Sequence, residues 1–338
     1  MKARILVLGA SGFVGTHLCR ALQASDWAIP IAASRRGGPR GNDEPAATEY
    51  LRLDATRSAP LAAAMRDVAG IVNCIAGAPH AIADSARELF VAAQALPHAP
   101  VVVHVSSMAV YGALTGEIVE SMPLPAELSP YGEAKRQAEG FASAYAPSVI
   151  LRPGIVYGPG SAQWSTRVAE WLFARRLGDL GPRGDGRCNL VHVDDLVAAI
   201  VHGLRDPSAR GRVYNLSLPS PPTWNDYFVD YARALRAVPV RRIGARRLRI
   251  ESRLLAPPLK VAEILAGRFA PGLTPRLPKA ISGSLVRLFT QEICLNVNAA
   301  ERDLAMRWTD LSRGLSQTAA WYRETTGRRH PTVSGTKT

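Results

Sequence analysis

The sequence predicts an α/β fold, a doubly wound parallel sheet joined to a smaller and mainly helical lobe. Residues 3–8 form a short run that is apolar except for Arg4, which is typical of a strand buried in a parallel sheet. Glycines follow at three-residue spacing, and apolar residues then recur at helical spacing as far as Leu22. Comparable apolar runs lie at 28–33, 71–77 and 101–107. Buried strands that alternate with helical segments favour a doubly wound sheet.

The composition agrees with a globular protein that has a full hydrophobic core. Of the 338 residues, 47% are hydrophobic and 20% are charged, within the range of folded domains. The four cysteines contain no Cys-x-x-Cys pair, so we expect no zinc site, no other metal site and no disulfide framework. We find no signal segment and no apolar run long enough to span a membrane. We therefore expect a soluble, cytoplasmic protein.

The first glycines indicate a nucleotide-binding loop. A tight turn needs a residue without Cβ, a pyrophosphate must approach bare backbone, and a helix N-terminus presents unpaired N–H groups to the anion. This loop stands between a predicted strand and a predicted helix, which is the context in which such glycines bind dinucleotides. The expected cofactor contacts are Gly9, Ser11, Gly12, Phe13, Val14 and Gly15.

The second predicted strand, residues 28–33, is followed by Ser34, Arg35 and Arg36. An NAD enzyme usually has an acid there to accept from the ribose 2′-hydroxyl, whereas an arginine accommodates the 2′-phosphate of NADP. No acid occurs between residues 28 and 40. We therefore predict NADP(H), bound at this end by these three residues. The alternative is NAD(H) beside a basic loop that only faces solvent.

The Gly-x-x-Gly-x-x-Gly spacing resembles that of extended and atypical short-chain dehydrogenases/reductases, in the NAD-dependent epimerase/dehydratase superfamily. The resemblance covers nearly the whole chain and implies a Rossmann-like sheet. It also implies an adenine contact for Asp54, at the end of the third strand, although a turn-forming role is the alternative. The fourth strand would end in the small residues Ala76 and Gly77, which let the cofactor pass closely. The role of Asn73 is left open.

The run 101–107 is followed by Val-Tyr-Gly and resembles the fifth strand of extended members. The resemblance implies that Ser107, four residues before Tyr111, is the catalytic hydroxyl. Ser106 would point to the other face of the strand. Simple turn formation is the alternative role for these serines.

Tyr131 and Lys135 form a Tyr-x-x-x-Lys pair on a helix that should begin at Pro130, with Ser129 as its cap. The two side chains then share one helix face. A phenol with a pKa of about 10 is a poor base at neutral pH, but a lysine ammonium and an oxidised nicotinamide nearby would favour the phenolate. Lys135 would also hold the ribose hydroxyls. We predict Ser107, Tyr131 and Lys135 as the catalytic set.

The run 149–160 resembles the next strand and loop of extended members and implies cofactor contacts at Pro153, Ile155 and Val156. We predict an NADP(H)-binding domain from residues 1–160 and 188–217. A substrate lobe would comprise 161–187 and 218–327, and 328–338 would be a flexible tail.

The segment 184–195 resembles the stretch that returns the chain to the sheet. In nucleotide-sugar epimerases an arginine of this stretch helps to bind the diphosphate, but Cys188 stands at that position here. The departure counts against a nucleotide-sugar substrate, with Arg183 and Arg187 as possible substitutes.

Residues 233–287 contain thirteen Lys or Arg and two acids, a net +11 of the formal +13 of the chain. A solvated arginine-rich lid, an anionic substrate and a weak contact with a membrane surface are three interpretations. Nucleic acid is disfavoured because no binding motif accompanies the charge. Residues 296–304 and 314–322 resemble members related to 3β-hydroxysteroid dehydrogenases and dihydroflavonol reductases, which act on bulky apolar alcohols and ketones.

These observations predict an NADP(H)-dependent oxidoreductase that interconverts a secondary alcohol and a ketone on a bulky, hydrophobic small molecule. An epimerase or dehydratase with a tightly bound cofactor is one alternative, for which Glu117 and Glu120 are the nearest extra acids. A non-catalytic NADP(H)-sensing protein is the other. The resemblance also implies a homodimer.

Overall fold

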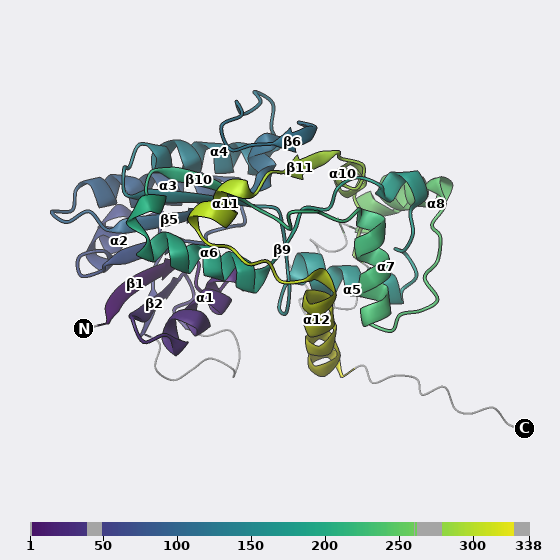
Figure 1. Cartoon of the computed structure of the whole chain (residues 1–338), viewed down its shortest axis with the longest axis horizontal. Coiled ribbons are helices and arrows are strands. Elements are labelled where there is room, and N and C mark those ends of the chain that lie inside the picture. The colour runs from purple at the N-terminus through teal and green to yellow at the C-terminus, as the bar shows by residue number, and fades with distance from the viewer. Residues whose placement is uncertain (1, 39–48, 260, 262–278, 328–338) are drawn as a thin grey trace, which may run out of the picture. The chain divides into compact units, whose positions relative to one another are not determined.

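The computed structural model describes residues 2–38, 49–259, 261 and 279–327 (Figure 1). The chain divides into two compact units, each assembled from three segments. Unit 1 comprises Met1–Val156, Asn189–Pro221 and Glu292–Trp308, and unit 2 comprises Tyr157–Cys188, Pro222–Gln291 and Thr309–Thr338. The predicted tail, 328–338, lies outside the described residues.

The described part of unit 1 is built on a seven-stranded sheet with the order β10-β7-β5-β4-β1-β2-β3, and every neighbouring pair is parallel. Its strands are β1 (Ala3–Leu8), β2 (Ala28–Ser34), β3 (Glu49–Arg52), β4 (Gly70–Asn73), β5 (Val101–Val105), β7 (Ser148–Pro153) and β10 (Arg212–Leu216). The strand order reverses between β1 and β4, the switch point at which doubly wound folds bind dinucleotides. The predicted Rossmann-like α/β fold is confirmed.

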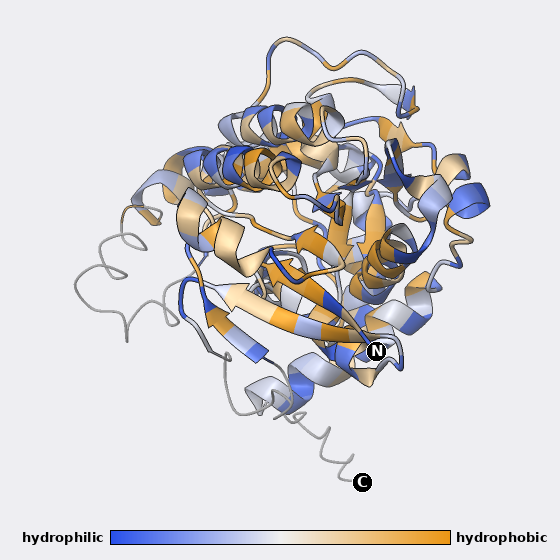
Figure 2. Ribbon diagram, turned by 90° about the vertical axis from the view of Figure 1, so that its left-hand side faces the viewer, coloured by the Kyte–Doolittle hydropathy of each residue, from blue (hydrophilic) through white to orange (hydrophobic). Residues whose placement is uncertain are grey.

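Helices cover both faces of this sheet. They are α1 (Phe13–Ala24), α2 (Ser58–Ala64), α3 (Pro79–Gln94), α4 (Pro130–Ser143) and α6 (Val193–Arg205). Alternate residues of β1 face opposite sides, so Val7 belongs to the core under α1 and α6, and Leu6 to the core under α2 and α3. Figure 2 shows the resulting apolar strands between amphipathic helices. Two hydrophobic cores therefore hold the sheet, one on each face.

The segment 292–308 belongs to unit 1, which corrects its predicted place in the substrate lobe. β11 (Ile293–Leu295) pairs with β6 (Gly116–Ile118). The side-chain amide of Asn189 donates to the Ile293 carbonyl at 2.8 Å and accepts from the Leu295 amide at 2.9 Å. The following helix α11 (Asn298–Asp303) contributes Ala300 to the unit 1 core. The other predicted boundaries lie within four residues of the observed ones.

A short pairing of β8 (Ile155–Tyr157) with β9 (Leu190–His192) follows β7. Unit 2 is mainly helical where it is described, with α5 (Arg167–Phe173), α7 (Trp224–Ala234), α8 (Ala245–Ile250), α10 (Gly283–Leu288) and α12 (Leu311–Thr326). Its core is aromatic: Trp224 lies 5.7 Å from Phe228 and 4.8 Å from Phe289 between ring centroids. No helix within the described ranges has the length and apolar character needed to cross a membrane.

Candidate active site

The glycine loop connects β1 to α1 and has the geometry of an anion cradle. Gly9 has a φ of +80°, which side chains other than hydrogen disfavour. A Cβ on Gly15 would overlap the Gly9 carbonyl oxygen, and one on Gly12 would lie 3.1 Å from the same atom. No side chain caps α1 and its first turn carries no acid, so its amides can meet an anion. The loop, including the partly buried Ser11, Phe13 and Val14, fits a dinucleotide pyrophosphate.

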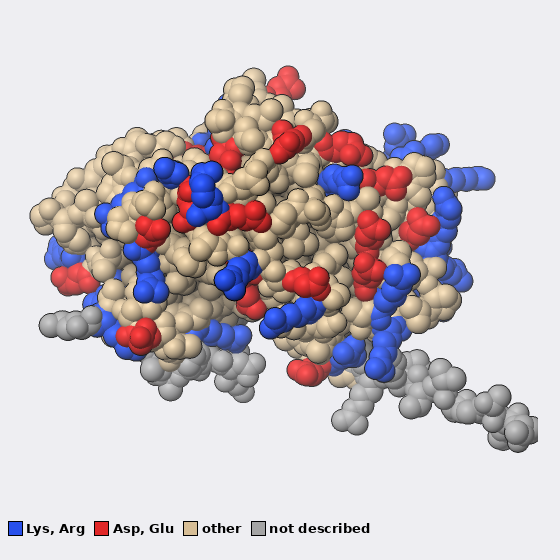
Figure 3. All heavy atoms as spheres, viewed as in Figure 1, with Lys and Arg blue, Asp and Glu red and all other residues tan. Residues whose placement is uncertain are grey.

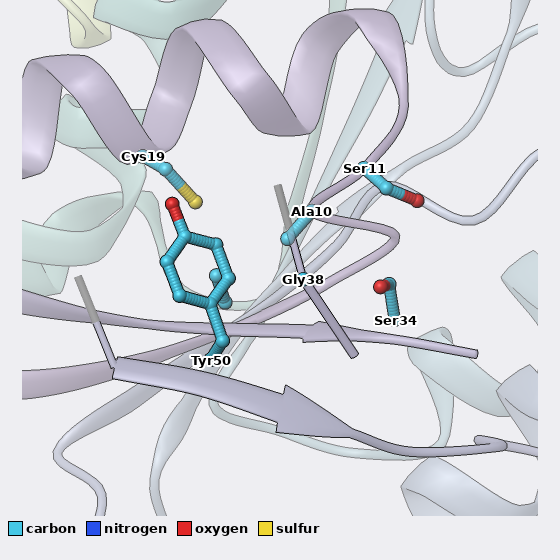
Figure 4. A pocket seen from close by; sticks show the side chains of 7 residues that line it. Ala10, Ser11, Cys19, Ser34, Gly38 and Tyr50 are labelled. Atoms are coloured by element: carbon cyan, nitrogen blue, oxygen red, sulfur yellow. The ribbon is translucent and has the colours of Figure 1, made fainter. Parts of the chain in front are cut away.

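A small pocket of about 10 Å³ lies beside this loop (Figure 4). Its described lining consists of Ala10, Ser11, Cys19, Ala32, Ser34, Gly38 and Tyr50. In Figure 4 the sulfur of Cys19 and the hydroxyl of Tyr50 point toward each other, while Ser11 and Ser34 lie at the opposite end. The pocket therefore joins the polar end of β2 to the glycine loop.

Arg35 and Arg36 follow β2 directly and are exposed. Asp54, also exposed, lies two residues beyond β3. Its carboxylate accepts from the Thr56 hydroxyl at 2.8 Å and from the Thr56 amide at 3.1 Å. These hydrogen bonds, and then Arg35, lower the pKa of Asp54. Asp54 therefore forms its own turn, and Arg35 is near enough to act on it.

Asn73, whose role the sequence left open, shapes the turn after β4. Its Oδ1 accepts from the Ile75 amide at 3.1 Å, and its Nδ2 lies 3.3 Å from Nδ1 of buried His104. The turn leads to the exposed residues Ala76 and Gly77, the latter with a φ of +121°. The open backbone there agrees with the predicted close passage of a cofactor.

Ser107 and Tyr131 meet beyond the end of β5. The Ser107 Oγ accepts from the Ala109 amide at 3.2 Å and so caps the short 3₁₀ turn Met108–Tyr111. Burial raises the pKa of Tyr131, and a side-chain hydrogen bond with Ser107 opposes that rise in part. The tyrosine nevertheless keeps 36% of its surface exposed. The Ser107 hydroxyl therefore favours the phenolate here, and the predicted effect of Lys135 on Tyr131 stays a prediction.

Lys135 is buried, with 2% of its surface exposed. Its Nζ donates to the Val105 carbonyl at 2.7 Å and to the Ile75 carbonyl at 3.2 Å. Burial lowers the pKa of Lys135 to about 8, against the opposing effects of Cys74 and Glu139. The ammonium therefore bridges the residues that follow β4 with the end of β5.

The first turn of α4 brings Tyr131 to Ser107. Ser129 accepts from the Gly132 amide at 3.1 Å and Pro130 is the first helical residue, as predicted. A Cβ on Gly132 would lie 2.5 Å from the Ala109 carbonyl oxygen, in the 3₁₀ turn that Ser107 caps. The missing side chain at Gly132 thus allows the helix to begin close to that turn.

A buried ion pair lies one helical turn beyond Lys135, and the sequence reasoning missed it. Arg152 donates from Nε and Nη2 to the Glu139 carboxylate, at 3.0 and 2.7 Å, and from Nη1 to the Tyr111 hydroxyl at 2.8 Å. Ser106 also donates to Glu139. The paired side chains are 7% and 5% exposed. The sequence did contain a signal for Glu139, because it follows Tyr131 and Lys135 at four-residue spacing and so lies on the same helix face.

The segment after β7 is closely packed. A Cβ on Gly154 would overlap the Asn189 carbonyl, and the Ile155 amide donates to that same oxygen at 2.6 Å. Pro153 and Ile155 are buried and Val156 is partly buried, and their cofactor contacts stay predictions. Cys188 is fully buried, and this burial raises the pKa of its thiol.

The cysteines are free thiols. Within the described ranges, no cluster of three or more His, Cys, Asp or Glu side chains could hold a metal ion.

Comparison with known sequences identifies relatives of this chain. The model of the NAD dependent epimerase/dehydratase family matches residues 5–217. A 2′-dehydrokanamycin reductase of Streptomyces kanamyceticus is 31% identical over 248 residues, which are 69% of this chain and 66% of that protein. Protein YeeZ of Escherichia coli K12 is 30% identical over 141 residues, which are 41% of this chain and 48% of that protein. The chain therefore spans less than two thirds of these curated relatives.

Solved structures share the fold. A dTDP-glucose 4,6-dehydratase from Bacillus anthracis, in complex with NAD, has a TM-score of 0.72 at 19% identity, over 96% of this chain and 98% of that one. A UDP-glucuronic acid 4-epimerase from Bacillus cereus, in complex with UDP-glucuronic acid and NAD, has a TM-score of 0.71 at 20% identity, over 95% and 99%. Because the family model covers more than half of the sequence, this chain belongs to the NAD-dependent epimerase/dehydratase family.

Proposed function

We propose that this protein is an NADP(H)-dependent reductase that interconverts a ketone and a secondary alcohol on a bulky, hydrophobic small molecule. The observation that carries the proposal is the hydrogen bond between Ser107 and Tyr131, with Lys135 buried one helical turn away. A proton donor, a hydroxyl that can orient a substrate oxygen and a cation thus lie beyond the ends of β4 and β5. Proton transfer coupled to nicotinamide redox chemistry needs this combination.

Ser107, Tyr131 and Lys135 would each have a separate role in the reaction. A bound nicotinamide would supply or accept the hydride. Ser107 would donate to the substrate oxygen and orient it. Tyr131 would give its phenolic proton to that oxygen during reduction and take it back during oxidation. Lys135 would hold the ribose hydroxyls.

The raised pKa of Tyr131 favours one direction of reaction. At neutral pH the phenol carries its proton, and a proton donor is what ketone reduction requires. The relative from Streptomyces kanamyceticus is named as a reductase, which is the same class of reaction.

The preference for NADP(H) is supported by the end of β2. Ser34 ends the strand in the small pocket, and the exposed Arg35 and Arg36 follow it. A guanidinium pairs well with a phosphate, whereas neither Arg35 nor Arg36 can supply the carboxylate that usually accepts from a ribose 2′-hydroxyl.

The test is a panel of ketones, including steroid-like, aromatic and aminoglycoside compounds, assayed with NADPH and NADH. The expected result is oxidation of NADPH by a bulky apolar ketone, which the Tyr131→Phe variant loses without losing NADPH binding. Retained turnover in that variant would remove Tyr131 from the mechanism.

The same panel separates the alternatives. An epimerase or dehydratase would form product with no net change in nicotinamide absorbance. Its candidate extra acids already have internal partners, because Glu117 accepts from the Asn296 amide side chain at 2.5 Å and Glu120 from the Asn215 backbone at 2.8 Å. A sensor would bind NADPH and turn over nothing.

A further inference from the structure

Unit 2 contains a cavity with a strongly cationic lining. Its volume is about 470 Å³, and its described lining consists of Arg183, Leu248, Arg249, Ser252, Arg253, Gly283, Val286 and Arg287. These residues come from the 3₁₀ turn Gly181–Gly184, from α8 and the turn after it, and from α10. A Cβ on Gly283 would meet open space, which agrees with an accessible cavity. All of these residues belong to one unit.

Among the described residues, no carboxylate pairs with the four cavity arginines, which are Arg183, Arg249, Arg253 and Arg287. No described side chain forms an ion pair or a hydrogen bond with their guanidinium groups. The sequence between Arg249 and Arg253 contains one acid, Glu251, which is buried. Both of its oxygens accept from Arg176, from Nε at 3.1 Å and from Nη2 at 2.7 Å. Its charge is therefore neutralised internally.

This arrangement is unfavourable without a counter-charge. Arg249 and Arg253 are four residues apart on a continuous helical run, a spacing at which like charges repel. Arg183 and Arg287 add two further cations to the same cavity. Figure 3 shows how basic side chains gather over the region of α8. An anion in the cavity would turn this repulsion into attraction.

The lining also indicates which anion would fit. Guanidinium groups match the oxygen geometry of a phosphate in paired hydrogen bonds, and the Ser252 hydroxyl adds a donor. Leu248 and Val286 supply apolar surface for the rest of a ligand. The volume is within the range of about 300 to 1,000 Å³ that is typical of small-molecule sites.

We propose that this cavity binds the phosphate groups of a small phosphorylated molecule. The proposal goes beyond the reductase activity and does not depend on it, because the cavity lies within unit 2 and involves none of the residues assigned to proton transfer. Arg183 contributes here as one of four cations rather than as a single substitute for the residue missing at Cys188.

The experiment is a calorimetric titration of the full chain with pyrophosphate at fixed ionic strength. Saturating NADP+ and NAD+ are present to fill the glycine loop, which could itself bind pyrophosphate. The test variant is Arg249→Gln/Arg253→Gln. The matched control is Arg233→Gln/Arg246→Gln, which removes two exposed arginines of unit 2 that lie outside the cavity lining.

The wild type and the control should bind pyrophosphate alike, and the test variant should bind at least about tenfold more weakly, since two charge-assisted contacts are lost. Melting temperatures check that both variants fold. Equal weakening in both variants, or no binding to the wild type, would overturn the proposal. A second titration uses vesicles of phosphatidylglycerol and phosphatidylcholine. If the test variant loses binding to these vesicles but still binds pyrophosphate like the wild type, the proposal is also wrong, because the arginines would then serve a membrane surface.

Discussion

Arg152 in unit 1 and the cavity arginines in unit 2 present two opposite environments for the same side chain. The Arg152 side chain is 7% exposed, and its Nε, Nη1 and Nη2 atoms all donate to protein oxygens. The cavity arginines are exposed, except for the partly buried Arg183, and no described residue accepts from their guanidinium groups. The difference teaches that a buried guanidinium stabilises the fold itself, whereas an exposed and unpaired one is available to a ligand. Lys135 is intermediate, because it is buried but donates to two uncharged carbonyls, those of Val105 and Ile75.

The largest expected effect follows from Arg152→Met. Removing one member of a buried pair leaves the Glu139 carboxylate without its counter-ion, so the free energy of unfolding should fall by about 3 to 5 kcal/mol. The Arg249→Gln/Arg253→Gln variant should change it by no more than about 0.5 kcal/mol. Urea denaturation of both variants measures the difference. Equal losses would end the distinction between the two environments.

Lys135→Met tests the intermediate case through pH. The folded-state pKa of about 8 is lower than the ordinary value of 10.5, so between these values the unfolded chain binds a proton that the folded chain does not. Stability should therefore rise with pH across this window, by up to roughly 3 kcal/mol, and be constant below it. The unfolding free energy of the wild type relative to Lys135→Met, measured at pH 8 and pH 10, reports this rise. A difference that is flat or falls with pH would contradict the burial of a charged ammonium.

Arg35→Gln/Arg36→Gln should change ligand preference without changing stability. The wild type should bind NADPH at least about tenfold more tightly than NADH, equivalent to about 1.4 kcal/mol, and the variant should lose this ratio. Arg20→Gln/Arg66→Gln removes two other exposed arginines of unit 1 and serves as the control. Fluorescence titration gives both affinities. If NADH binds as tightly as NADPH to the wild type, the cofactor prediction is wrong.

Ser107→Ala should reduce kcat/KM, because this serine would orient the substrate oxygen. The smallest effect, measured on the activity that remains, should be a shift in the pH profile. Alcohol oxidation needs the phenolate, so its kcat/KM should rise with pH as Tyr131 ionises. The hydrogen bond from Ser107 lowers the pKa of Tyr131, and its loss should move the midpoint to higher pH. Ser106→Ala is the matched control, because Ser106 donates to Glu139 instead. An unchanged midpoint in the Ser107→Ala variant would show that Ser107 does not lower the pKa of Tyr131.

The parts that could be predicted from sequence are those with a local cause. The glycine loop, the apolar strands and the cap at Ser129 each follow from neighbouring residues, and the structure places them as expected. The sequence also assigned the serine after β5 and the tyrosine of α4 to one site, and the two side chains share a hydrogen bond. The catalytic role of Ser107 came from the resemblance to known enzymes and stays a prediction.

The remaining features depend on residues distant in sequence. Glu139 is paired with Arg152 only because α4 packs on the sheet beside β7, and neither residue has a distinctive neighbour. The return of 292–308 to unit 1 depends on the amide of Asn189, about a hundred positions earlier. The hydrogen bonds from Lys135 to the carbonyls of Ile75 and Val105 could not be predicted either, because helix spacing gives the direction of a side chain but not its partners on other strands.

The division of each unit into three segments has a practical consequence for exchanging substrate-binding regions among relatives. The polypeptide passes back and forth at five junctions, so no single cut and splice can transplant the helical portion. A chimaera must replace the three segments of unit 2 together and retain β11 from the recipient protein, because β11 belongs to unit 1. Directed evolution of new specificity in this scaffold is therefore better served by point changes in unit 2 than by swapping contiguous gene fragments.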